Sequence, residues 1–196
     1  MAINKLDKIT KLYFTYFDVA KALKITEKAA IVTCSRYVKT GFLIRLKKNI
    51  YVKKSSWNFL SNQECFEIAN LLQVPSYISF TTALSYYGLT TQIQQNYFES
   101  AALKRTHMRE IFGKVFNYSK IKKELYFGFE RYNNFFIALP EKAILDSLYL
   151  QFLGKYKLDL SAIAMDSINI VKLEKLAKSY TRFFKKYLKK ILLDRY

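Results

Sequence analysis

Two acidic side chains in the second half of the chain have the types needed for general acid–base chemistry. Glu141 and Asp146 lie five positions apart in a segment that Pro140 opens as a helix. Side chains at this spacing point about 140° apart around a helix, which suits neither a shared proton nor a shared metal ion. The helix dipole favours an acid in the first turn and explains Glu141. We therefore expect no catalytic pair, and Asp146 is expected to be buried or to face a partner.

The other candidates for catalysis or metal binding stand alone. His107 is the single histidine and lies in a basic polar segment, where we expect it to be solvated or to contact a partner. Cys34 and Cys65 have no further Cys or His beside them, whereas a structural zinc site needs about four such ligands. We expect two buried free thiols, with a disulfide as the alternative. All five glycines are isolated, so no glycine-rich loop could cradle a phosphate. The sequence predicts no enzyme activity, no metal and no cofactor.

Positive charge is the strongest signal, and it is unevenly distributed along the 196 residues, whose formal net charge is +18. Residues 1–60 carry 13 Lys and Arg against 3 Asp and Glu, residues 61–150 carry 9 against 8, and residues 151–196 carry 11 against 4. Two basic ends around a near-neutral middle indicate that the segments have different functions. The uncharged stretch 68–98 is interrupted by polar residues, so it lacks the run of about 18 apolar residues that a membrane span needs. We expect a soluble, cytoplasmic protein with no secretory signal and no membrane partner.

The first 57 residues have the element order of a winged helix-turn-helix domain. Apolar residues spaced by three predict a helix over 3–12, and a short β-prone stretch follows at 13–16. Asp18 is placed to cap a second helix and Thr26 a third, which ends before Gly41. A basic hairpin over 43–52 then turns at Asn49, a residue type that tolerates positive φ. In this fold the third helix enters the major groove of DNA.

The predicted third helix has an inward face and a polar face. Ala30, Cys34, Tyr37 and Gly41 share the first and are expected to pack inward. The second face and the hairpin are expected to contact double-stranded DNA, because cations that neutralise phosphates release counterions and so supply affinity. The predicted DNA-binding residues are Thr26, Lys28, Val32, Ser35, Arg36, Lys39, Arg45, Lys47, Lys48, Asn49 and Lys53.

Residues 58–196 read as a mixed α/β domain with a helical tail, so that the whole chain is predicted to be α+β. Helices are predicted at 63–74, at 81–87 and from Pro140 through Leu150, and strands at 77–80, 96–102, 112–118 and, once or twice, within 124–138. The polar segment 104–110 is expected to separate two strands. In the tail, apolar residues at helical spacing should dock a helix and leave its lysines in solvent, or facing DNA or an acidic partner: Leu173, Leu176, Tyr180, Phe183, Phe184, Tyr187, Leu188 and Ile191.

Three segments resemble a known family. Residues 22–52, ALKITEKAAIVTCSRYVKTGFLIRLKKNIYV, resemble the N-terminal winged helix of AbiEi-type antitoxins from type IV toxin–antitoxin systems. YISFTTALSYYGLT at 77–90 and FFIALPEKAILDSLYL at 135–150 are similar to the two best-marked segments of that family's C-terminal domain. The similarity covers most of residues 15–152. Family wings often carry Gly at the turn, where this chain has Asn49.

The resemblance implies a bacterial or archaeal DNA-binding repressor of an abortive-infection operon. Its winged helix would bind promoter repeats, and its second domain would counter a cognate nucleotidyltransferase-like toxin through residues that the sequence does not identify. Two alternatives stay open. One is a stand-alone winged-helix repressor whose second domain serves dimerisation or ligand sensing. The other is a nucleic-acid-processing enzyme that uses the basic domain for targeting.

Overall fold

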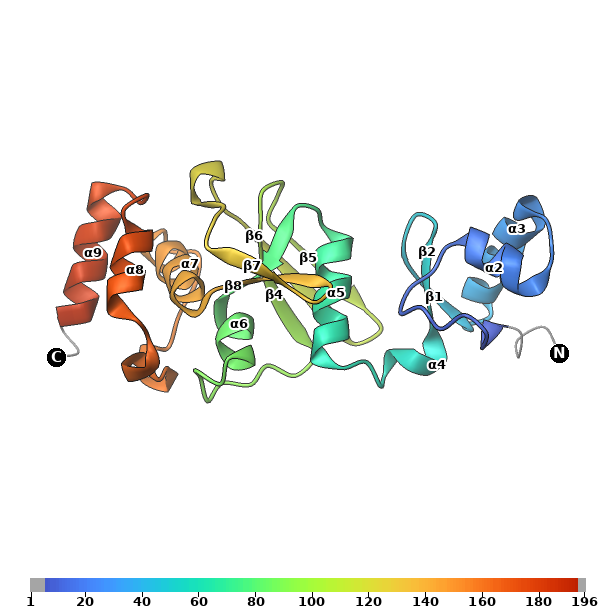
Figure 1. Ribbon diagram of the computed structural model, residues 1–196, viewed down its shortest axis with the longest axis horizontal. Coiled ribbons are helices and arrows are strands. Elements are labelled where there is room, and N and C mark those ends of the chain that lie inside the picture. Colours follow the sequence, from blue (N-terminus) through green and yellow to red (C-terminus); the bar gives the residue numbers. More distant parts are fainter. Residues whose placement is uncertain (1–5, 194–196) are drawn as a thin grey trace. The chain divides into compact units, whose positions relative to one another are not determined.

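The computed structural model describes residues 6–193, and the chain divides into two compact units between Glu64 and Cys65. The sequence analysis placed this boundary between residues 57 and 58. Helices accompany one sheet of two strands and one of six among the described residues (Figure 1), so the protein is α+β.

The first unit consists of two helices, a hairpin and a short helix: α2 (Tyr16–Leu23), α3 (Glu27–Lys39), β1 (Leu43–Lys47), β2 (Ile50–Lys53) and α4 (Lys54–Trp57). Thr15, not Asp18, is the N-cap of α2. The Asp18 carboxylate accepts hydrogen bonds from the Thr15 N–H at 2.8 Å and from the Thr15 hydroxyl at 3.0 Å. In this capping box the acid sits three residues after the cap, so the predicted start was three residues late. Helix α3 begins after its predicted cap, Thr26.

The segment before α2 differs from the prediction. Residues 3–5 of the expected helix over 3–12 lie outside the described residues, and residues 9–12 are not helical. Leu6 and Ile9 are buried in the core of the first unit. Phe14 exchanges two backbone hydrogen bonds with Tyr51, at 2.9 and 2.8 Å. The regularly spaced apolar residues therefore belong to an irregular segment that packs against the rest of the first unit. Its backbone pairing with the hairpin outweighs the local preference for a helix.

The core of the first unit confirms the inward face predicted for α3. Ala30, Cys34 and Tyr37 are buried, and burial raises the pKa of the Cys34 thiol to about 11. Gly41 has φ +76°, the left-handed conformation expected just after a helix end. Cys34 and Cys65 are both buried free thiols, as predicted.

The second unit is built on a six-stranded sheet in the order β5-β6-β4-β3-β8-β7. Its strands are β3 (Ser76–Ile78), β4 (Tyr97–Ala102), β5 (His107–Ile111), β6 (Lys114–Lys120), β7 (Phe129–Tyr132) and β8 (Phe135–Ala138). The central strand β3 runs antiparallel to β4 and parallel to β8, while β4 and β6 are parallel. The pairs β5–β6 and β7–β8 are antiparallel hairpins.

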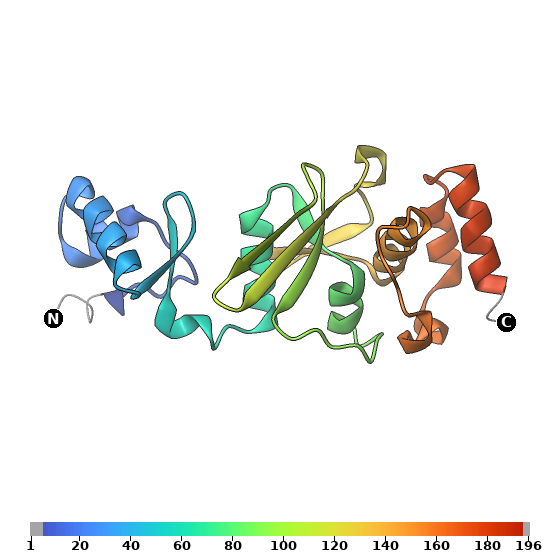
Figure 2. The same ribbon diagram turned by 180° about the vertical axis from the view of Figure 1, so that it is seen from behind.

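Helices accompany this sheet: α5 (Asn62–Leu72), α6 (Phe80–Tyr86), α7 (Pro140–Phe152), α8 (Ile170–Ala177) and α9 (Arg182–Leu193), with short 3-10 turns at Lys123–Leu125, Leu160–Ala162 and Met165–Ser167. Helix α5 covers one face of the sheet, as the front and back views show (Figures 1 and 2). The Tyr118 hydroxyl on β6 donates to the Ala69 carbonyl of α5 at 2.7 Å. Helices α7, α8 and α9 gather at one end of the unit.

Two predictions about the second unit were wrong. The polar segment 104–110 is not only a connection, because His107–Ile111 forms strand β5 at an edge of the sheet. Edge strands tolerate charged side chains, which removes the apolar signal that would have revealed a strand. In the tail, Phe184 and Leu188 are buried as expected, but Phe183 is 78% exposed. Adjacent residues are about 100° apart on a helix, and of the pair Phe183 and Phe184 it is Phe184 that packs on Tyr149 and Phe152 of α7.

Candidate nucleic-acid interface

One face of α3 is free of the core and carries five of the eleven predicted DNA contacts. Lys28, Ser35, Arg36 and Lys39 are exposed, and Val32 is 68% exposed in their midst. The neighbouring Ile31 is also exposed, and the sequence analysis did not single it out. The face therefore combines cations with a hydroxyl and aliphatic side chains, the groups that contact phosphates, base edges and thymine methyls.

The helix is anchored at the start of this face. The Thr26 hydroxyl accepts a hydrogen bond from the Ala29 N–H at 3.3 Å and so caps the first turn. This bond confirms the predicted Thr26 cap and gives the hydroxyl that was also expected to contact DNA a partner within the protein. The guanidinium of Arg36 lies 5.7 Å from the centre of the Tyr37 ring, which is a cation–π contact.

Several cations of this unit lack internal counter-charges. Across residues 6–193, no ion pair involves Lys28, Arg36, Lys39, Arg45 or Lys48. In β1, Arg45 points outward between the buried Ile44 and Leu46, as strand alternation requires. An exposed, unpaired cation keeps its hydration and can exchange water for a phosphate at little cost in fold stability.

Two predicted hairpin residues, Asn49 and Lys53, have partners within the protein. Asn49 has φ +60°, and its side-chain carbonyl accepts a hydrogen bond from the Tyr16 N–H at 3.1 Å. This bond joins the hairpin turn to the start of α2. The Lys53 ammonium lies 3.9 Å from the Asp7 carboxylate, and Lys53 and Lys47 are only half-exposed. The hairpin therefore presents Arg45 and Lys48 more freely than its other predicted residues.

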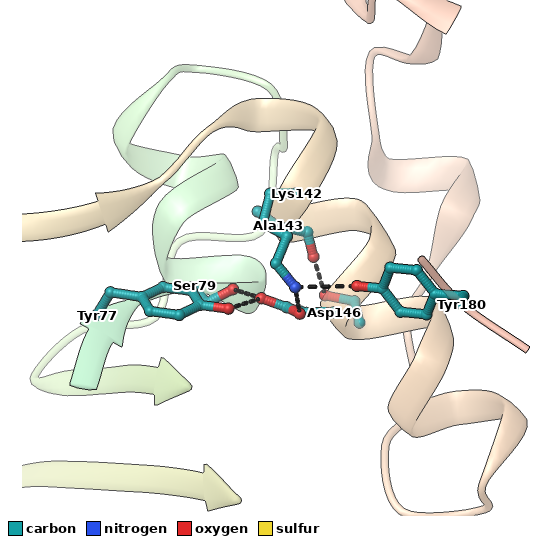
Figure 3. Close-up of polar contacts among 7 residues, drawn as sticks. Tyr77, Ser79, Lys142, Ala143, Asp146 and Tyr180 are labelled. Carbon is teal, nitrogen blue, oxygen red and sulfur yellow. Dashed lines mark hydrogen bonds and ion pairs between the residues drawn. The ribbon is translucent and has the colours of Figure 1, made fainter. Parts of the chain in front are cut away.

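A second polar cluster lies inside the second unit (Figure 3). Lys142 on α7 forms an ion pair with Asp146 one turn later and donates to the Tyr180 hydroxyl at 2.9 Å. The other Asp146 oxygen accepts from the hydroxyls of Tyr77 and Ser79, each at 2.8 Å. All five side chains are at most 4% exposed. We call this cluster the buried ionic centre.

The electrostatics of the buried ionic centre follow from its enclosure. Burial lowers the pKa of Lys142, and the adjacent Asp146 carboxylate opposes that shift. Burial and the same carboxylate raise the pKa values of Tyr77 and Tyr180. The hydrogen bonds of the cluster join α7 to β3 and to the segment before α9. Because its side chains are buried, the cluster offers no surface to a substrate. The i,i+4 spacing of Lys142 and Asp146 was the sequence signal that could have revealed it.

Glu141 belongs to a different contact, since its carboxylate lies 3.1 Å from the Lys172 ammonium of α8. Glu141 and Asp146 thus have separate partners, consistent with the prediction that they do not act as a pair. No group of three potential metal ligands from Cys, His, Asp and Glu occurs among residues 6–193. Over the same residues, no helix has the length and apolar character needed to cross a membrane.

A further buried acid lies beside α6. Glu99 on β4 is 3% exposed, and its carboxylate accepts from the Tyr156 hydroxyl at 3.0 Å. Burial raises the pKa of Glu99 to about 7, although hydrogen bonds from Tyr156 and from the backbone of Thr82 and Thr81 act in the opposite direction. The sequence analysis did not identify this group, because a single Glu in a strand gives no signal of its depth.

Comparisons with known proteins place the fold. No family model and no curated protein matches the chain. Among solved structures, it is similar to the RV2827C protein from Mycobacterium tuberculosis, with a TM-score of 0.52 and 10% sequence identity. The similarity covers 89% of this chain and 69% of that one. At this identity the likeness concerns the fold alone.

Proposed function

We propose that the first unit is a winged helix-turn-helix domain that binds double-stranded DNA, and that the protein represses its own operon. The observation that carries this proposal is the two-faced character of α3. One face packs into the core through Ala30, Cys34 and Tyr37, and the other is exposed with unpaired Lys28 and Arg36. Helix α3 serves as the recognition helix, and β1–β2 is the wing that approaches the phosphate backbone.

The antitoxin role of the second unit rests on the family resemblance, and the fold is consistent with it. The two family-like segments, 77–90 and 135–150, are far apart in sequence but meet in space. Strand β3 pairs with β8 through Ile78 and Ile137, and Tyr77 bonds to Asp146 of α7. The quoted motifs are therefore mostly buried and form a framework, so we expect most of the surface that counters a nucleotidyltransferase-like toxin to lie outside them. The closure of the buried ionic centre argues against its use in catalysis.

Promoter binding tests the DNA-binding proposal. We expect Arg36→Ala and Lys28→Ala to weaken binding by about 1–3 kcal/mol where the side chain contacts a base, with relaxed sequence preference, and to weaken all sequences alike where it contacts a phosphate. Gel shifts on the native promoter and on scrambled DNA measure both effects. Lys175→Ala, which removes an exposed helical cation from α8, is the matched control. Wild-type binding by both α3 variants would refute the assignment of this face.

Toxin rescue tests the second role in the full-length protein. The Lys28→Ala/Arg36→Ala double variant should lose repression yet still protect cells that express the toxin from the neighbouring gene. Loss of protection at equal protein level would show that the two roles are not carried by separate units. A neighbouring gene that does not encode a nucleotidyltransferase would instead favour a stand-alone repressor.

A further inference from the structure

The second unit contains a cavity that neither the DNA-binding face nor the buried ionic centre uses. Its volume is about 640 Å³, within the usual range of roughly 300–1,000 Å³ for small-molecule sites. It lies between the end of β6, the last turns of α7 and the loop that follows. Its lining includes three lysines and several apolar or aromatic residues: Lys120, Lys122, Lys155, Tyr149, Leu150 and Leu153. We call it the lysine-rimmed cavity.

The charges of the cavity have one sign. Lys120, Lys122 and Lys155 are exposed, and no acidic residue is among the described residues that line the cavity. Within residues 6–193 none of the three forms an ion pair. Three ammonium groups around one hollow suit a multiply charged anion, and lysine binds phosphate as a point charge.

One polar group at the cavity lacks a protein partner. Tyr149 is 4% exposed and lines the cavity, yet its hydroxyl forms no hydrogen bond with any described residue. The ring of Tyr149 contacts the rings of Tyr180 and Phe184, and the same residue lines the cavity. A bound molecule could therefore hydrogen-bond to this hydroxyl.

The end of α7 opposes an anion only weakly. A helix C-terminus carries about half a negative charge. Its last carbonyls, however, are already hydrogen-bonded: Tyr149 accepts from Leu153 at 3.2 Å, and Leu150 accepts from Lys155 at 2.8 Å. Three full positive charges face this partial one. The apolar side chains of Leu150 and Leu153 add a surface for a flat or hydrocarbon body.

We propose that the lysine-rimmed cavity binds a phosphorylated small molecule of nucleotide size. Its phosphate contacts the lysines, and its apolar body lies on Leu150 and Leu153 and reaches the Tyr149 hydroxyl. This makes the second unit a ligand-binding domain. The proposal does not depend on DNA binding by α3, because the two sets of residues belong to different units.

Calorimetric titration of the full chain with ATP, AMP, adenosine and inorganic phosphate at low ionic strength tests the proposal. We expect ATP and AMP to bind more tightly than adenosine or phosphate alone, because only they join the charge to an apolar body. The Lys120→Gln/Lys122→Gln/Lys155→Gln variant should lose about tenfold or more in affinity. Tyr149→Phe should lose about two- to tenfold, the effect of one hydrogen bond.

Nucleotides can also bind weakly to any basic surface, and a matched variant separates this effect. Lys28→Gln/Arg36→Gln/Lys39→Gln removes three cations from α3 and should leave the nucleotide affinity unchanged. Equal loss in both triple variants would overturn the proposal in favour of non-specific anion binding. Absence of binding by all four probes at millimolar concentration would also overturn it. Displacement of AMP from the α3 variant by duplex DNA would assign the cavity to nucleic acid instead.

Discussion

In the first unit, Lys28 and Arg36 project from α3 into solvent, whereas Lys142 in the second unit is fully buried between Asp146 and Tyr180. The difference is energetic. An exposed cation keeps its water and is available to an external anion, while a buried one must be paired and hydrogen-bonded to offset desolvation. The exposed charges of α3 should therefore control binding, and the enclosed charges of Lys142 and Asp146 should control stability.

The strongest test of this contrast is removal of the buried cation. Lys142→Met should lower the free energy of unfolding by about 3–5 kcal/mol, because it leaves the Asp146 carboxylate buried without its counter-charge. Urea denaturation followed by circular dichroism measures the loss. Adding Asp146→Asn removes the stranded charge but keeps an acceptor for Tyr77 and Ser79, so it should recover part of the stability. Lys175→Met, at an exposed site, is the control, and a Lys142→Met loss below about 1 kcal/mol would contradict the contrast.

Glu99 extends the comparison to a buried acid. Since its pKa is raised from the ordinary 4.5 to about 7, folding favours the protonated form. Its contribution is fully present below pH 4.5 and is lost as the pH rises through 7. Relative to Glu99→Gln, the wild type should lose roughly 2 kcal/mol of unfolding free energy between pH 5 and pH 8. Parallel pH profiles of the two proteins would disprove the shifted pKa.

Asn49 sharpens the contrast within the first unit, because a residue expected to contact DNA has an internal partner. Asn49→Ala should destabilise the protein by about 1–2 kcal/mol, through loss of the acceptor for Tyr16 and strain at positive φ. Asn49→Gly removes only the hydrogen bond and should cost less. Thermal unfolding of the three proteins measures this order. Equal stability of all three proteins would show that the hydrogen bond between Tyr16 and Asn49 does not contribute to stability.

The smallest effect is expected in the tail, where α9 is basic but exposed like α3. Replacing Lys185, Lys186, Lys189 and Lys190 by Gln should change stability by less than about 0.5 kcal/mol, since these side chains are in solvent. Promoter affinity measured across a salt series should keep its slope. A slope of log K against log salt that becomes shallower by about 0.9 per lysine would place the tail on DNA. Lost toxin rescue with an unchanged slope would assign it to the toxin.

Local chemistry made much of the first unit predictable from sequence. The Thr26 cap, the positive φ of Gly41 and Asn49, and the inward face of α3 all follow from interactions within a few residues. The start of α2 was missed even though its signal was local, because Thr15 and Asp18 are both good caps and only the structure shows which one begins the helix. The exposed face of α3 was likewise predictable from the sequence, since helical periodicity separates its residues from those that face the core.

The remaining features depend on contacts between distant residues, which no local pattern contains. Tyr77 and Asp146 are joined across 69 positions, and Asn49 and Tyr16 across 33. The sequence shows that Lys142 and Asp146 lie one helical turn apart, but their burial depends on how β3 and the tail pack around α7. The sequence by itself thus determined the start and end of α3, the turn of the hairpin and the two faces of α3. Only the tertiary structure decided which charges remain in solvent and which are enclosed, because burial is set by the packing of segments that the chain brings together from far apart.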